Sequence, residues 1–566
     1  MHKQWIFRPL PECSAVTTLA EAIRVNPAIA TLLVQKGITS FDQARAYFRP
    51  SLADLHEPFA MKDMHKAVDR LVQAIKNREA ILVYGDYDVD GVTSVAMVYG
   101  FIKKLHDQVH SYIPDRYTEG YGLSQQAVAW AARMGIQLLI TLDCGIKAIH
   151  CIQQAQTAGI DVIVCDHHEP GAVLPPAYAI LNPKQSTCSY PFKELSGCGV
   201  GFKLLQGLSL QEKHPEDSLY TYLDLVAIST ACDLVPMVGE NRILAYHGLH
   251  KLNTRPHLGL QALIRSANLY PPLSASELVF GLGPRLNAAG RIDHGSLAVR
   301  LLLTTDQATA DTLARTLETK NELRKHLDST ITGEAIDMLA SNARTAQAKT
   351  TVLFKEDWHK GVLGIVAARC VEQYYRPTII LTAAEGKATG SARSVTGFNI
   401  YEALTACKEL LDQYGGHAHA AGLTLPLAHV ADFQERFEAV VAHSIQDDLL
   451  IPKQRVDLSL PLDKIDAKFY KVLKQMAPFG NGNMKAAFAT DPVIASSYSI
   501  LKGQHLKLYL YQPGMQHRLE AIGFGLAHYE PVIRDQKPFR IVYTLGENNY
   551  QGEPSLQLTI KDIQGK

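Results

Sequence analysis

Three aspartates at alternate positions, Asp86, Asp88 and Asp90, follow a short apolar stretch in the segment ILVYGDYDVDG. Carboxylates this close repel one another unless a cation lies between them. An EF-hand calcium loop would need a bidentate glutamate at its twelfth position, and counting from Asp86 that position is Met97. The segment therefore predicts a cation site of another kind.

Two further apolar stretches also run directly into possible ligands. Asp143 follows one in TLDCG, and Asp166, His167 and His168 follow the other in VCDHHEP. Because the carboxyl ends of parallel strands meet at one edge of a sheet, we expect these groups to converge with the three aspartates. Oxygen ligands with an imidazole suit Mn²⁺ or Mg²⁺ better than zinc. The alternative for any single acid is structural; Asp166, for example, would then cap a helix.

The number of carboxylates exceeds what one ion needs. Two ions about 3.5–4 Å apart, bridged by a shared carboxylate, would balance the charge, and this arrangement is the usual one for phosphoester hydrolysis. The sequence therefore predicts a two-metal phosphoesterase site.

The elements that must position these groups alternate between strands and helices from about residue 65 to residue 305. This alternation predicts an α/β fold with a parallel sheet. The expected strands cover residues 81–84, 137–142 and 161–165, and the expected helices cover residues 93–105, 125–133, 146–158 and 220–232. We expect a catalytic domain over residues 65–305, preceded by a helical cap over residues 1–64.

The second half of the chain shows three other patterns. Residues 306–344 carry leucines at helical spacing and predict a long connecting helix. Strands on either side of the helix GVLGIVAARCVEQYY predict a smaller α/β domain over residues 345–447. Alternating apolar residues in 448–566 predict short antiparallel strands in a barrel or sandwich.

The composition limits the function classes. The 566 residues carry 56 basic and 56 acidic side chains, so a surface for polyanions must be local. Nine cysteines without a CxxC pair suit reduced thiols. No segment has the roughly 18 consecutive apolar residues of a membrane span. We expect a cytoplasmic protein that acts as a monomer and not at a membrane.

Several motifs resemble a known family. YGDYDVDG, TLDCG, CDHHEP and ACDLVP, in this order, resemble the four motifs of the DHH phosphoesterase superfamily. GLGPRLNAAGR, WHKGVLGIVAAR, GSARS, GGHAHAAG and PFGNGNMKAAF resemble the RecJ family of bacterial single-strand-specific 5′ to 3′ exonucleases. The resemblance covers nearly the whole chain. It implies a DHH lobe, a DHH-associated substrate-binding domain over residues 345–447 and an OB-fold over residues 448–566.

The resemblance also implies a role for each acid and histidine. His168 would face the scissile phosphate, and the nucleophile would be a water molecule whose pKa the ions lower. Asp86 would bind an ion through water or only shape its loop. The implied metal ligands are Asp90, Asp143, His167 and Asp233 for one ion, and Asp88 with the bridging Asp143 for the other.

Substrate-binding residues follow from the same resemblance. A 5′-terminal phosphate carries more charge than an internal one, and forked arginines read it well. Each arginine has a salt bridge as its alternative role, and Tyr117 and Tyr121 are candidates either for base stacking or for loop packing. The implied residues are Arg116, Ser391 and Arg393 at the 5′ phosphate; Arg285, Asn287 and Arg291 at the nearby backbone; and His417 and His419 in the glycine-rich GGHAHAAG segment.

The main prediction is a Mn²⁺- or Mg²⁺-dependent exonuclease that degrades single-stranded DNA from 5′ to 3′, releases 5′-mononucleotides and acts in DNA repair and recombination. Single-strand-binding protein and a helicase are candidate partners. The nearest alternative is a DHH-family oligoribonuclease or cyclic-dinucleotide phosphodiesterase, for which the cap and the C-terminal domain would be superfluous. A DNA-binding scaffold that does not cut is a third reading, and it predicts broken metal ligands.

Overall fold

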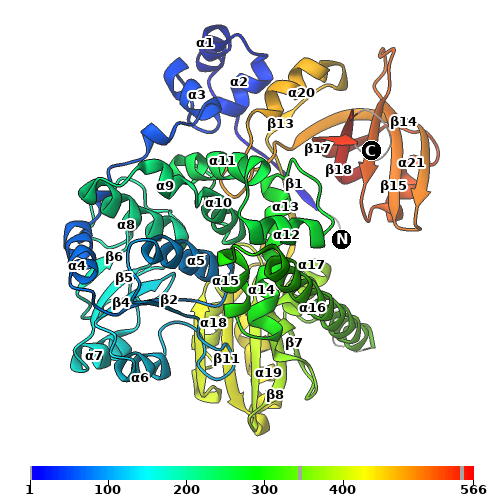
Figure 1. Cartoon of the computed structure of the whole chain (residues 1–566). Coiled ribbons are helices and arrows are strands. Elements are labelled where there is room, and N and C mark those ends of the chain that lie inside the picture. The colour runs from blue at the N-terminus through cyan, green and yellow to red at the C-terminus, as the bar shows by residue number, and fades with distance from the viewer. Residues whose placement is uncertain (1–2, 342–346, 549–553, 566) are drawn as a thin grey trace. The chain divides into compact units, whose positions relative to one another are not determined.

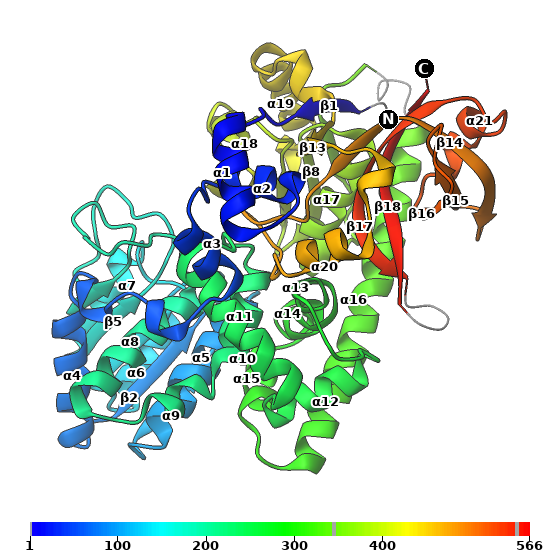
Figure 2. The same ribbon diagram turned by 90° about the horizontal axis from the view of Figure 1, so that it is seen from above.

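The computed structural model describes residues 3–341, 347–548 and 554–565. The chain forms two compact units: a larger one from residues 9–321 and 457–566, and a smaller one from residues 1–8 and 322–456. Figures 1 and 2 show the elements of both. Within the described ranges, no helix combines the length and the apolar character that crossing a membrane requires.

The larger unit contains a five-stranded parallel sheet with the order β3-β2-β4-β5-β6. The prediction of a parallel sheet is confirmed. Since β3 and β4 pair with opposite edges of β2, the topological switch point lies beside β2, where open parallel sheets bind ligands. The strands are β2 (Ile81–Gly85), β3 (Val109–Tyr112), β4 (Leu138–Leu142), β5 (Asp161–Cys165) and β6 (Ala179–Leu181).

Helices cover both faces of this sheet (Figure 1). Val83 and Ile140 pack into the core on one face, and Leu82 and Leu139 into the core on the other, because successive strand residues point to opposite faces. The helices of the first core include α4 (Met64–Lys76), α5 (Val89–Lys103) and α8 (Gly197–Glu212), and those of the second are α6 (Gln125–Arg133) and α7 (Ile149–Thr157).

Helix α5 begins at Val89, four residues before the predicted start at Thr93. Asp88 caps it, since its carboxylate accepts a hydrogen bond from the Gly91 amide at 3.1 Å. Asp90 therefore lies in the first helical turn and not in a loop. Helix α7 begins at Ile149, three residues later than predicted.

A helical layer completes this part of the larger unit. Helices α10 and α11 pack closely against each other, and the loop between them carries Asp233. A π-helical turn, Leu278–Leu282, precedes α14. The helices are α9 (Glu216–Tyr220), α10 (Leu223–Cys232), α11 (Gly239–Thr254), α12 (Leu258–Ser266), α13 (Ala275–Glu277), α14 (Gly283–Ile292) and α15 (Ser296–Leu303).

The rest of the larger unit joins the N-terminal helices to a C-terminal barrel. The pairing of β14 with β17 closes the sheet β13-β14-β15-β16-β18-β17 into a ring, so the structure is a barrel and not a sandwich. Leu19, Ile29 and Leu33 of the helices share one hydrophobic core with Phe469 and Phe488 of the C-terminal region. The elements are α1 (Cys13–Ile23), α2 (Pro27–Val34), α3 (Phe41–Phe48), β13 (Leu458–Ser459), α20 (Ala467–Lys474), β14 (Phe488–Leu501), β15 (His505–Tyr511), β16 (Leu519–Gly523), α21 (Glu530–Ile533), β17 (Phe539–Asn548) and β18 (Ser555–Gly565).

The smaller unit contains a mixed five-stranded sheet with the order β10-β11-β9-β8-β7. Its strands and helices are β7 (Thr351–Phe354), α17 (Leu363–Tyr374), β8 (Thr378–Ala384), β9 (Lys387–Arg393), α18 (Ile400–Thr405), β10 (Gln413–His417), β11 (Ala420–Pro426) and α19 (Val430–Ser444). Strand β1 (Gln4–Phe7) pairs in parallel with β12 (Lys453–Val456) in the same unit.

One long helix, α16 (Gln307–Ser341), begins in the larger unit and ends in the smaller one, which confirms the predicted connection. Residues 342–344 of the predicted connecting segment lie outside the described residues, as do residues 1–2, 549–553 and 566 of the predicted terminal domains.

The shared core predicts that a substitution that destabilises the barrel also destabilises the N-terminal helices. Phe488 is fully buried in this core, so Phe488→Ala should cost about 3–5 kcal/mol of stability. Hydrogen exchange should then accelerate both in β14 and in α2. The matched control is Phe524→Ala, because Phe524 is 64% exposed in the same region. Faster exchange confined to the barrel would contradict a shared core.

Candidate metal centre

Four segments bring acids and histidines together in the larger unit. Asp86, Asp88 and Asp90 follow β2, Asp143 follows β4, His167 and His168 follow β5, and Asp233 follows α10. Within each of three groups, the possible ligand atoms all lie within 4.8 Å of one another. These groups are Asp86, Asp88 and Asp143; Asp90, His167 and Asp233; and Asp143, His167 and His168.

Asp90 is the most firmly held of these acids. Its carboxylate accepts hydrogen bonds from the amides of Gly197 and Cys198, at 2.7 and 2.8 Å, in the first turn of α8. Ser229 Oγ lies 2.7 Å from the same carboxylate. These donors hold the Asp90 side chain in one orientation at a site where it is only 1% exposed.

Asp143 is placed by an unusual backbone conformation. Its φ of 60° lies in the left-handed region, and its amide still donates to the carbonyl of Cys165 at 2.9 Å. A Cβ atom on Gly197 would lie only 2.6 Å from the Asp143 Cβ, so this approach requires glycine. Burial, and then the charges of Asp90 and the neighbouring aspartates, raise the pKa of Asp143 well above its usual value.

His167 lies among three of the carboxylates. Its Nε2 atom is 3.1 Å from Asp143, 3.5 Å from Asp233 and 3.7 Å from Asp90. Burial lowers its pKa, which favours the neutral imidazole that binds metal ions. Burial, and then the charges of Asp90 and Asp88, raise the pKa of Asp233 to about 8.

Asp86 and Asp88 form the second side of the cluster with Asp143. One carboxylate oxygen of Asp86 is buried without a hydrogen-bond partner among the described residues. A buried carboxylate oxygen without a donor is costly unless a cation satisfies it. The donor set, which consists of carboxylate oxygens and one imidazole, therefore fits Mn²⁺ or Mg²⁺.

His168 is held most closely by Asp166, and its Nδ1 atom also lies 3.9 Å from Asp143. Its Nδ1 atom lies 2.7 Å from Asp166 Oδ1, while its Nε2 atom lies 3.1 Å from the hydroxyl of Tyr121. Burial opposes a charge on His168, but the hydrogen bond to Asp166 raises the pKa of His168 to about 9. Burial likewise opposes the Asp166 carboxylate, and its bond to His168 still lowers the pKa of Asp166 to about 2.

Asp166 also accepts hydrogen bonds from the amides of Ile146, His167 and His168, at 2.9, 2.7 and 3.0 Å. It belongs to none of the three ligand groups. Its position is that of a residue that orients the His167–His168 segment.

The predicted substrate residues of the larger unit have partners within the protein. Arg116 lies over the ring of Tyr87, 4.9 Å from its centroid. Asn287 accepts a hydrogen bond from the Val89 amide at 3.2 Å. It therefore contacts the backbone between Asp88 and Asp90.

Arg285 is buried and pairs with Glu318 of α16, as the salt-bridge alternative described. The hydroxyl of Tyr117 donates to the carbonyl of Arg291, which corresponds to loop packing. Contacts of Arg116, Arg285, Asn287 and Arg291 with DNA stay predictions.

The other predicted substrate residues lie in the smaller unit. Arg393 Nη1 lies 2.9 Å from Ser391 Oγ on β9. A Cβ atom on Gly364, in the first turn of α17, would meet both side chains at 2.6 and 3.0 Å. His417 and His419 flank the turn from β10 to β11, with their ring centroids 6.1 Å apart.

Sequence reasoning missed Ser196 and Ser229, which support Asp90. Ser196 caps α8 by accepting a hydrogen bond from the Gly199 amide, and its Oγ lies 2.7 Å from that of Ser229. The serine before a run of glycines in SGCGVG is a recognisable helix-start signal. The position of Ser229 inside a buried helix carries no such signal.

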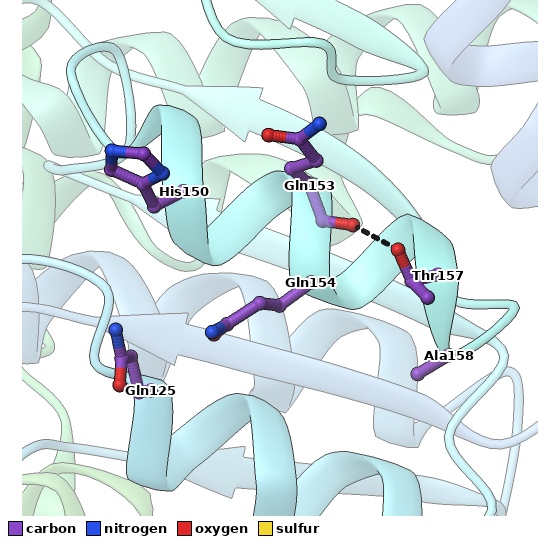
Figure 3. Close-up of a pocket in the computed structure, with 6 residues that line it drawn as sticks. All are labelled: Gln125, His150, Gln153, Gln154, Thr157 and Ala158. Atoms are coloured by element: carbon purple, nitrogen blue, oxygen red, sulfur yellow. Dashed lines mark hydrogen bonds between the residues drawn. The ribbon is translucent and has the colours of Figure 1, made fainter.

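An open groove between α6 and α7 differs from the acidic cluster in the side chains that line it (Figure 3). No acid or permanently charged side chain lines it, and none of the possible metal ligands does. The lining residues are Gln125, His150, Gln153, Gln154, Thr157 and Ala158. This groove offers hydrogen bonds but no cation site.

Family comparisons match the chain in three parts. The DHH family, N-terminal domain, matches residues 80–230, the DHHA1 domain matches residues 347–443, and the RecJ OB domain matches residues 456–562. The barrel is therefore an OB-fold, as the resemblance implied.

Relatives and solved structures agree with these matches. The single-stranded-DNA-specific exonuclease RecJ of Bacillus subtilis is 38% identical over 98% of this chain and 70% of its own length. The protein of the same name from Haemophilus influenzae is 35% identical over 91% of this chain and 92% of its own. The structure of Thermus thermophilus RecJ in complex with Mn²⁺ matches with a TM-score of 0.85 and 27% identity, over 100% of this chain and 80% of that one. On this evidence the chain belongs to the RecJ family of single-stranded-DNA-specific exonucleases, within the DHH family.

Proposed function

We propose that this protein is a Mn²⁺- or Mg²⁺-dependent exonuclease that degrades single-stranded DNA from its 5′ end and releases 5′-mononucleotides. The observation that carries the proposal is the cluster of carboxylates around His167, with a buried Asp86 oxygen that has no hydrogen-bond donor among the residues that the structure describes. Membership of the RecJ family supports the substrate and the reaction.

The proposed ligands divide between two ions. Asp90, Asp143, His167 and Asp233 would hold one ion, and Asp88 and the shared Asp143 would hold the other, with Asp86 grouped with Asp88 and Asp143. Bound metal would lower the pKa of the attacking water and offset the charge that develops on the phosphate. The protein's own contribution is to fix these carboxylates before substrate arrives.

His168 is proposed to act on the substrate and not on the metal. Asp166 occupies its Nδ1 atom, so Nε2 is the atom available to donate a proton or a hydrogen bond to the phosphate or the leaving oxygen. The Tyr121 hydroxyl beside Nε2 supports this orientation.

The 5′ end is proposed to bind in the smaller unit. Ser391 and Arg393 lie beside Gly364 in the first turn of α17, and a hydroxyl, a guanidinium and helix amides together suit a terminal phosphate. Arg116, Arg285, Asn287 and Arg291 of the larger unit, and His417 and His419 of the smaller one, are also proposed to contact the DNA.

The alternative readings have less support. A DHH-family oligoribonuclease or cyclic-dinucleotide phosphodiesterase would share the metal centre but would not need the OB-fold over residues 456–562. A non-cutting scaffold would have lost ligands, whereas each proposed metal ligand belongs to one of the three groups of possible ligands, which supports a working site.

Cellular context is also proposed. Nine cysteines without disulfides fit a reducing compartment, which supports action in the cytoplasm. We propose that the protein works as a monomer, with single-strand-binding protein and a helicase as partners.

The two-ion assignment predicts that Asp143→Asn abolishes both activity and metal binding. Loss of one bridging charge should reduce the rate at least a hundredfold at saturating Mn²⁺, because both ions depend on it. In the wild type, Mn²⁺ at about 100 times its Kd should stabilise the fold by about 2.7 kcal/mol, and the variant should lose this effect in thermal melting. Asp107→Asn is the matched control, since Asp107 is exposed. A variant that keeps near-normal activity would refute the bridging role.

His168→Ala should separate chemistry from metal binding. We expect kcat to fall by about 10²–10⁴-fold while the Mn²⁺ affinity, measured by calorimetry, stays unchanged, because His168 is held by Asp166. His443→Ala removes an exposed histidine and serves as the control. A parallel loss of metal affinity would instead make His168 a ligand.

The proposed anchor predicts that Arg393→Ala discriminates between DNA ends. Removing a charged hydrogen-bond partner should lower kcat/KM about tenfold or more for 5′-phosphorylated substrates, and much less for 5′-hydroxyl substrates. The ratio of kcat/KM values on the two substrates measures the effect. Arg436→Ala, in the same unit and paired at the surface with Glu409, is the control. Equal losses on both substrates would indicate a general backbone contact.

A further inference from the structure

The segment Pro478–Asn483 (PFGNGN) forms a tight hairpin between α20 and β14, here called the entrance hairpin. Gly480 and Asn483 exchange two backbone hydrogen bonds, of 3.2 and 2.9 Å. Gly482 has a φ of +71°, which a turn of this kind reserves for glycine. Asn481 is therefore presented at the tip of the turn.

The tip of the entrance hairpin bonds to the loop that follows Asp233. Asn481 Nδ2 donates to the carbonyl of Leu234 at 2.9 Å, and the Met237 amide donates to the carbonyl of Asn481 at 2.6 Å. A Cβ atom on Gly480 would lie 3.2 Å from the Met237 side chain, so the two segments are in close contact. A segment almost 250 residues further along the chain thus supports the loop of residues 233–238.

This loop needs support because of where Asp233 lies. Asp233 is the first residue after α10, and its side chain is 27% exposed, against 1% for Asp90 and 3% for Asp143. Leu234 has a φ of 58°, in the left-handed region that is unfavourable for a residue with a Cβ atom. Such a residue persists only where its surroundings hold it.

The hydrogen bond from Asn481 acts on this strained residue. It holds the Leu234 carbonyl, so it opposes a return of Leu234 to an ordinary conformation. Because Leu234 is bonded directly to Asp233, such a return would move the backbone beside the Asp233 carboxylate, which lies 3.5 Å from His167.

The base of the entrance hairpin is itself fixed. Asn483 donates to the carbonyls of Met476 and Pro478 at 3.0 and 2.8 Å, and it accepts from the Tyr47 hydroxyl at 2.9 Å. Arg242, buried on α11, lies over the Tyr47 ring and donates to the carbonyls of Met476, Ala477 and Pro478. The hairpin is therefore a rigid support and not a free loop.

We propose that Asn481 is a positioning residue for the metal centre, which holds the Asp233 loop in the conformation that binds Mn²⁺. This inference rests on the proposed function, since it takes Asp233 as a metal ligand. It assigns to the OB-fold region a role in forming the catalytic site in addition to binding DNA.

The test is calorimetric Mn²⁺ binding to the full-length protein. Asn481→Ala should raise the Kd for Mn²⁺ by about tenfold, the lower end of the range for residues that support metal ligands, and should raise the Mn²⁺ concentration for half-maximal activity in parallel. The melting temperature in chelator should not change. Asn481→Asp keeps the size but replaces the donor, so it should show the same loss even if the alanine variant folds poorly. Asn77→Ala, at an exposed asparagine, is the matched control.

Asp233→Ala provides the reference that separates the two proposals. If Asp233→Ala leaves Mn²⁺ binding unchanged, the proposed ligand set is wrong, and this inference falls with it. If Asp233→Ala weakens binding and both Asn481 variants bind like wild type, the positioning role alone is refuted. A fall in melting temperature in chelator for both Asn481 variants would also refute it, because the hairpin would then stabilise the whole unit.

Discussion

Repulsion among carboxylates governs the architecture of the larger unit. Five of them, from Asp86, Asp88, Asp90, Asp143 and Asp233, lie in overlapping groups at the switch point of a parallel sheet. Two like charges 4 Å apart cost about 4 kcal/mol at an effective dielectric constant of 20. The fold reduces this cost by giving Asp90 two helix amides and a hydroxyl, and it leaves the remaining charge for metal ions to neutralise. The glycine at position 197 and the left-handed backbone at Asp143 follow from the close approach that this arrangement demands.

The two adjacent histidines illustrate how the fold separates roles over a single peptide bond. His167 is buried among carboxylates, which suits a neutral ligand, whereas His168 is paired with Asp166 and reaches Tyr121 at a more exposed position. Asp166 makes this separation possible, because it accepts from the amides of both histidines and from one imidazole only. Asp166, which belongs to none of the three ligand groups, thus orients the two histidines differently.

The C-terminal barrel is integrated into the larger unit and is not an appended module. Its core is continuous with that of the N-terminal helices, so these helices and the barrel fold as one body. Arg242 connects α11 to the segment before the barrel through backbone carbonyls, and the entrance hairpin continues to the loop that carries Asp233. The barrel and the loop that carries Asp233 are therefore connected by packing and hydrogen bonds within one unit.

The sequence alone determined the features that depend on neighbouring residues. Apolar stretches that run into acids identified the ligand loops, and hydrophobic periodicity identified the parallel sheet, the long helix and the β-rich tail, because these patterns repeat over a few residues. Motif resemblance then named the family. Tertiary structure alone decided which groups pair across elements: Ser229 with Asp90, Asn287 with the Val89 amide, Glu318 with Arg285 and Asn481 with the Leu234 carbonyl. These partners come from other elements, and in all but the Arg285 pair they lie more than a hundred residues away. A side chain's hydrogen-bond partner depends on how elements pack, which no local pattern records.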